Sequence, residues 1–113
     1  MSENDSQVTW QAESTNPELI EGFKEKMAEI IDPEIGLNII QLGLVRDLII
    51  EGDSAVVKMI LTTPFCPYGP AMLETTRQKA ESYLQRPTTI DLGLEMWTPD
   101  MMEEEARMDW GFF

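Results

Sequence analysis

The sequence predicts an α+β fold: a two-layer sandwich in which two helices cover one face of a three-stranded sheet, followed by a short C-terminal helix. The first observation is the order of the apolar patterns, which reads helix, strand, strand, helix, strand. The second is that both predicted helices are amphipathic, and a sheet with one apolar face needs such cover. The third is the length of 113 residues, of which 42% are hydrophobic, which suits one core in one domain.

The first helix is predicted to begin after Asn16, a suitable N-cap that is followed by Pro17 at the first helical position. Apolar residues then recur at helical spacing, and they are Leu19, Ile20, Phe23, Met27, Ile30 and Ile31. Pro33 disfavours helical geometry in the residue before it and has no amide hydrogen to donate. The helix should therefore end near Asp32, and Asp32-Pro33-Glu34 should form a turn.

The residues in front of this helix are polar and show no sustained periodicity. We expect residues 1–16 to form a flexible acidic leader, with Trp10 as its only large side chain. The remaining residues, 17–113, are expected to form a single domain.

Two strands and a second helix should follow. Residues 44–51 and 55–61 are rich in β-branched and apolar residues, and Gly52-Asp53 between them is a turn signal, so a hairpin is predicted. Prolines at 64, 67 and 70 then keep the chain extended until Pro70 can begin a helix. The predicted apolar face of this helix consists of Met72, Leu73, Thr76, Ala80, Tyr83 and Leu84. Pro87 should end it.

The last part of the domain is predicted to be a strand and a short helix. Four apolar residues alternate with other residues in the pattern of a strand with one buried face, namely Ile90, Leu92, Leu94 and Met96. The final helix should be capped by Thr98 or Asp100. The aromatic residues of segment 110–113 either complete the core or dock into a partner.

The charge of the chain excludes several classes of partner. Eight Lys and Arg residues face 21 Asp and Glu residues, which gives a net charge of −13. Binding to nucleic acid or to an anionic membrane surface needs basic side chains, so neither is expected. No apolar run is long enough to span a membrane, and the N-terminus lacks the basic region of a signal peptide. We therefore expect a cytoplasmic protein.

Missing residue types narrow the chemistry further. The chain has no histidine, which removes imidazole metal ligands and the histidine-activated nucleophiles. It has one cysteine, Cys66, so it can form no internal disulfide. One cysteine cannot supply the four ligands of a closed zinc or iron-sulfur site, so any cluster must be shared with a partner.

Cys66 is the candidate reactive residue. It lies between a predicted strand end and a predicted helix start, where backbone amides and the positive end of the helix dipole favour a thiolate. The alternative is a small buried hydrophobe with no chemical role. Position alone leaves both interpretations open.

Asp32 and Glu34 form the second candidate constellation. Two carboxylates around a proline could be oxygen ligands, a general base, or acceptors of the hydrogen bonds that shape the turn. Spacing does not show whether this turn faces Cys66.

Seven short motifs follow one another along the chain: DPE at 32–34, NII at 38–40, LGLV at 42–45, LTTPFCP at 61–67, WTPDMM at 97–102, EAR at 105–107 and WG at 110–111. With these motifs the chain resembles the small iron-sulfur cluster assembly family that includes the SufT and PaaD-type proteins. The motifs cover about residues 17–111 in a specific order. The acidic segment after the third predicted strand is most similar to the SufT branch.

The resemblance implies a role in maturing iron-sulfur proteins, with Cys66 as the reactive residue and Asp32 and Glu34 close to it. It implies partners among the iron-sulfur assembly machinery and its apo-clients, and a cluster or iron that is bound in passing and never stably by a monomer. An adaptor or transient carrier is the leading hypothesis, which makes a non-enzymatic factor more probable than an enzyme. The alternatives are a cysteine-dependent thiol enzyme and an interaction module with an inert cysteine. A homodimer is compatible with the sequence.

Overall fold

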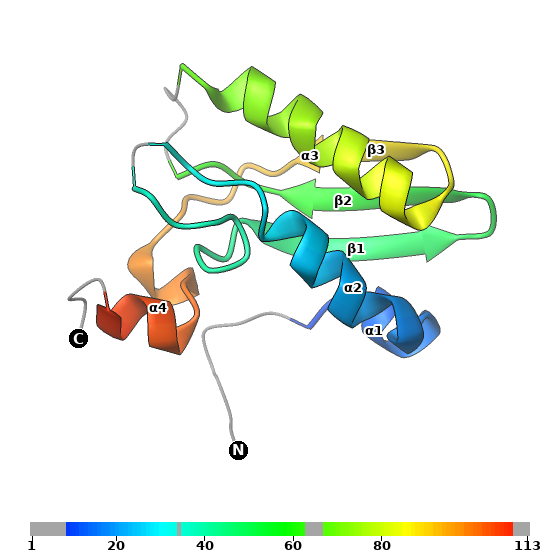
Figure 1. Ribbon diagram of the computed structural model, residues 1–113, viewed down its shortest axis with the longest axis horizontal. Coiled ribbons are helices and arrows are strands. Elements are labelled where there is room, and N and C mark those ends of the chain that lie inside the picture. The colour runs from blue at the N-terminus through cyan, green and yellow to red at the C-terminus, as the bar shows by residue number, and fades with distance from the viewer. Residues whose placement is uncertain (1–8, 34, 63–66, 110–113) are drawn as a thin grey trace.

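A three-stranded sheet forms one layer of the molecule, in the computed structural model that describes residues 9–33, 35–62 and 67–109 (Figure 1). Strands β1 (Val45–Glu51) and β2 (Ser54–Met59) are antiparallel, whereas β3 (Thr88–Leu92) runs parallel to β2. The order is β1-β2-β3, so β1 and β3 are the edges. The predicted hairpin is confirmed, and its turn contains Gly52 in the left-handed conformation.

Two helices form the second layer. Helix α2 (Pro17–Met27) precedes the hairpin, and α3 (Gly69–Leu84) connects the parallel strands β2 and β3. The residues that they bury beneath them alternate along the central strand β2, and they are Ala55, Val57 and Met59. The predicted α+β sandwich is therefore confirmed. The apolar face predicted for α3 is also correct, since its buried residues include Met72, Thr76, Ala80 and Leu84.

Helix α2 ends earlier than predicted, at Met27 instead of near Asp32. The amide of Ile30 donates to Met27 in a tighter final turn, and the carbonyl of Ile30 accepts the amide of Ile39. Ile31 pairs with Asn38 in an isolated β-bridge. These residues therefore keep their apolar spacing but make their backbone bonds across the α2–β1 loop instead of along a helix. Asn16 occupies the N-cap position without a side-chain capping bond.

The described part of the expected leader packs against the domain. Helix α1 spans Ala12–Thr15, and the Trp10 side chain is only 4% exposed. Trp10 packs edge-on against Phe23 with ring centroids 5.6 Å apart, and its indole N–H donates to the carbonyl of Val45. Residues 10–15 thus differ from a flexible leader, because one buried tryptophan removes enough apolar surface from water to hold the segment.

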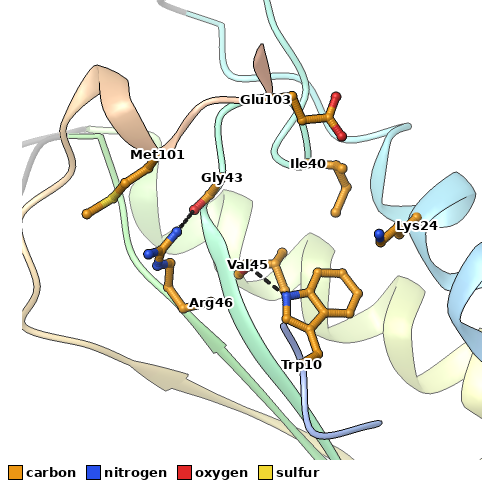
Figure 2. Close-up of a pocket in the computed structure, with 8 residues that line it drawn as sticks. All are labelled: Trp10, Lys24, Ile40, Gly43, Val45, Arg46, Met101 and Glu103. Carbon is orange, nitrogen blue, oxygen red and sulfur yellow. Dashed lines mark hydrogen bonds between the residues drawn. The ribbon is translucent and has the colours of Figure 1, made fainter. Parts of the chain in front are cut away.

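Trp10 also lines a small hollow between the N-terminal segment and the C-terminal part of the chain (Figure 2). Its volume is about 30 Å³, and Gly43 and Met101 lie on the side opposite Lys24. The Arg46 guanidinium donates to the carbonyl of Gly43 at 3.0 Å. The hollow has room for about one water molecule, which is too little for a small-molecule ligand.

The chain after β3 differs most from the prediction. β3 ends at Leu92, and Leu92, Leu94 and Met96 are 48%, 99% and 78% exposed, so the prediction that these three residues belong to a buried strand face is wrong. The Gly93 amide still bonds to Met59, but Met59 is the last residue of β2. The following residues therefore have no neighbouring strand beside which a buried face could form.

The predicted C-terminal helix is divided in two. A 3₁₀ turn, η1 (Pro99–Met101), is followed by α4 (Glu104–Asp109), and both lie at the end of the sheet where β2 ends (Figure 1). Between them Met102 is extended and fully buried, and the Glu103 amide donates to the carbonyl of Gln41. This anchoring interrupts the helix. The aromatic residues of segment 110–113 lie outside the described residues.

A surface ion pair connects α3 to the turn that follows α2. The Lys79 ammonium lies 2.8 Å from the Glu29 carboxylate, and this hydrogen bond and charge hold the pKa of Glu29 below its usual value. Because the pKa of Glu29 is lower in the folded than in the unfolded protein, the ion pair stabilises the fold at pH values above the unfolded-state pKa. This stabilisation is lost as the pH falls through the folded-state pKa. We expect Glu29→Gln to lower the Tm slightly near neutral pH, by a difference that shrinks as the pH falls below the ordinary glutamate pKa of 4.5. Thermal unfolding across this range measures it, and Glu25→Gln on the same surface is the control; a pH-independent difference would contradict it.

Candidate functional site

The α2–β1 loop holds Asp32 in a compact turn. The Asp32 amide donates to Leu37, its carbonyl accepts the amide of Gly36 at 2.8 Å, and Gly36 adopts a positive φ of 85° that favours glycine. Asp32 is only 1% exposed. The predicted turn at the Asp-Pro-Glu motif is therefore present around Asp32, and its acid points into the protein. Glu34 lies outside the described residues.

The motif that contains Cys66, residues 61–67, contacts the Asp-Pro-Glu turn through Thr62. The Thr62 hydroxyl donates to the Asp32 carboxylate at 3.2 Å, although 30 residues separate them in the sequence. Thr62 begins the loop that contains Cys66, and Cys66 itself lies outside the described residues. The structure thus joins Asp32 to the first residue of the cysteine loop, while the positions of Cys66 and Glu34 stay predictions.

The same loop is also fixed where it ends. Helix α3 begins at Gly69, one residue before Pro70, and a Cβ at Gly69 would lie 2.9 Å from the Leu61 side chain. The glycine therefore allows the helix start to pack closely against the end of the β2 segment. Because Leu61 packs against Gly69, the two ends of the cysteine-containing loop lie next to each other, and the first of them, Thr62, contacts Asp32.

This geometry favours one of the three roles considered for Asp32. A buried carboxylate is costly unless hydrogen-bond donors satisfy it, and Thr62 supplies one. Asp32 therefore acts as an acceptor that ties two loops together. Its role as an oxygen ligand or as a base toward iron stays a prediction.

An apolar pocket borders the site on the side of β3. Its volume is about 250 Å³, and Thr62 forms part of its wall. The other residues that line it are Leu61, Leu92, Gly93, Leu94, Glu95, Met96 and Trp97. Sequence reasoning did not identify Thr62 or this pocket. The only local signal was a threonine pair between a strand end and a proline-stiffened loop, which by itself marks no site.

Thr62→Val should reveal the strength of the contact between the two loops. Valine keeps the shape of threonine but removes the hydroxyl, so the buried carboxylate of Asp32 loses a donor. We expect the free energy of unfolding to fall by about 1–2 kcal/mol. Urea denaturation measures it, with Thr62→Ser expected to stay close to wild type and the exposed Thr89→Val as the control. Equal stability of Thr62→Val and wild type would contradict the role assigned to this bond.

Within residues 9–33, 35–62 and 67–109, no group of three or more carboxylate or thiol side chains is arranged to hold a metal ion. Separately, none of the helices in the described part is both long and apolar enough to cross a membrane.

The fold and the site define a class: a small α+β domain in which an aspartate turn is hydrogen-bonded to the start of a cysteine-containing loop. Residues 24–89 match the sequence family described as iron-sulfur cluster assembly protein. The chain belongs to this family, which confirms the resemblance of its motifs.

Relatives with similar sequences carry consistent descriptions. An Fe-S protein maturation auxiliary factor from Porphyromonas gingivalis is 38% identical, over 81% of this chain and 90% of the relative. The Fe-S protein maturation auxiliary factor SufT of Staphylococcus aureus is 33% identical, over 73% of this chain and 97% of the relative. The crystal structure of a domain of unknown function from Bacillus anthracis covers 88% of this chain and 98% of its own, with a TM-score of 0.74 and 21% identity. This last similarity supports the fold alone.

Proposed function

We propose that this protein is a cytoplasmic maturation factor for iron-sulfur proteins, an adaptor or transient carrier that delivers clusters to apoproteins through Cys66. The observation that carries the proposal is the hydrogen bond between Thr62 and Asp32, which joins the two family motifs at the start of the cysteine loop. Membership of the iron-sulfur assembly family and the names of the maturation factors that resemble the chain support it.

In this proposal the cluster is cargo and Cys66 is its point of contact. A thiolate is a strong ligand of iron, and α3, which begins three residues after Cys66, favours the thiolate form through its amides and dipole. Asp32 orients the loop through Thr62, and Glu34 lends an oxygen or tunes the sulfur. Because one chain has only one cysteine, the donor or the recipient supplies the other ligands throughout the transfer.

A cluster-transfer assay tests the proposal. A scaffold protein loaded with a [2Fe–2S] cluster is mixed anaerobically with an apo-ferredoxin, and circular dichroism follows the cluster as it enters the ferredoxin. Substoichiometric amounts of this protein should accelerate the transfer. Purification of a monomer that holds a full cluster by itself, or the absence of any acceleration with several donors and recipients, would contradict the proposal.

A further inference from the structure

The end of β3 and the residues directly after it expose a row of apolar side chains, and hydrogen bonds at Gly93 and Trp97 attach this segment to the rest of the domain. We call residues 92–96 the edge strip; Leu92, Leu94 and Met96 are its exposed apolar members. The Gly93 amide donates to the carbonyl of Met59 at 2.9 Å. At the other end the Trp97 indole donates to the carbonyl of Leu42 at 2.7 Å. The strip is thus fixed at both ends and in place before any partner arrives.

Its backbone is also open to pairing. β3 is an edge strand, and Pro87 and Gly93 direct their backbone groups toward β2, since Pro87 accepts from Ala55 and Gly93 donates to Met59. Backbone groups alternate in direction along an extended chain, so those of Leu92 and Leu94 point to the free side. Among the described residues no backbone hydrogen bond engages Leu94 or Met96. An extended apolar edge of this kind is a template for one more strand.

Charge decides which strand fits. Asp91 and Glu95 are exposed along the strip; Arg46 is paired with Glu95 at 3.3 Å, and Lys58 is the register partner of Asp91 on β2. A second copy would bring another net charge of −13 and would place its own Asp91 and Glu95 against these acids. A partner segment with apolar residues between lysines or arginines would match both the apolar side chains of the strip and the negative charge of the protein around it.

We propose that the edge strip is a docking site for an extended segment of a partner protein, with alternating apolar and basic residues, which adds to β3 as a further strand. The pocket beside the strip includes Thr62, so a partner bound there would lie next to the start of the cysteine loop. The purpose of the surface rests on the proposed function, but binding itself needs no cluster.

The test uses the full-length protein and a labelled synthetic peptide in which valine and leucine alternate with lysine and arginine. Fluorescence anisotropy measures its Kd, and two matched peptides carry glutamate in place of the basic residues or serine in place of the apolar ones. Both should bind at least about tenfold more weakly. Amide exchange followed by NMR should show new protection at Leu92 and Leu94. Equal affinity for all three peptides would overturn the proposal.

Leu94→Pro is the decisive variant. Proline removes an outward amide that the folded chain does not use, so the fold should persist while peptide affinity falls about tenfold. Leu94→Ala keeps the amide but removes the side chain and should also weaken binding, which covers a failure of the proline variant to fold. Met108→Ala, which removes another exposed apolar side chain, is the control. Unchanged affinity in both Leu94 variants would overturn the proposal.

Other occupants give different results. Dimers in sedimentation equilibrium that Leu94→Glu abolishes would assign the strip to a second copy. Increased amide exchange at Leu94 after removal of residues 110–113 would assign it to the chain's own aromatic end. Either result would overturn the proposal. The peptide-binding experiment contains no iron, so a failure to bind the peptide would not contradict the proposed cluster transfer. Conversely, a failure of cluster transfer would not contradict the proposed docking site.

Discussion

Cys66→Ser is expected to reduce cluster transfer to the background rate measured without the protein. Serine has nearly the same size, but its hydroxyl is not ionised near neutral pH and is a poor ligand for iron compared with a thiolate. Because no second cysteine exists in the chain, no other residue can replace the lost thiolate. The measurement is the transfer assay with the apo-ferredoxin, at equal concentrations of variant and wild type.

Two controls separate this effect from a structural one. Cys66→Ser should keep the Tm of the wild type within a few degrees, and iodoacetamide should alkylate wild-type Cys66 with an apparent pKa below the ordinary value of about 8.5. A variant Cys66→Ala that retains full transfer would contradict the carrier hypothesis. If deletion of the acidic C-terminal segment then abolished function, the protein would be an interaction module with an inert cysteine.

The sequence predicted those elements whose signals are local. The hairpin turn at Gly52-Asp53 and the buried face of α3 depend on residues that are close together in the chain, and both are as predicted. Leu92, Leu94 and Met96 continue the alternating pattern of Ile90, but the pattern does not show that β2 ends at Met59, the register partner of Leu92. Whether an alternating segment is buried depends on its neighbours, which are distant in the sequence.

The candidate site was predictable only in its parts. The turn at Asp32 followed from Pro33, because proline excludes a helix there. The contact between Asp32 and Thr62 did not follow, since it depends on how the α2–β1 loop packs against the end of β2. The two motifs could be named from the sequence, but their juxtaposition is a property of the fold.

Gly43→Ala is expected to destabilise the protein more than any other single methyl group added to a described loop. Gly43 has a φ of 74°, which strains any residue with a Cβ, and the new methyl would overlap the carbonyl oxygen of Met101. Backbone cannot rotate away as a side chain can, so η1 must move. We expect the free energy of unfolding to fall by at least about 3 kcal/mol in urea denaturation.

Gly36→Ala is the matched control for this loss. Gly36 also has a positive φ, 85°, but a Cβ there would meet no atom within 4 Å. It should therefore lose only the backbone term, about 1–2 kcal/mol. The difference between the two variants measures how firmly the C-terminal part is held at Gly43, and faster amide exchange at Glu103, which bonds to Gln41, should accompany it in Gly43→Ala alone. Equal losses would mean that η1 moves aside freely and that Met101 contributes nothing to the attachment.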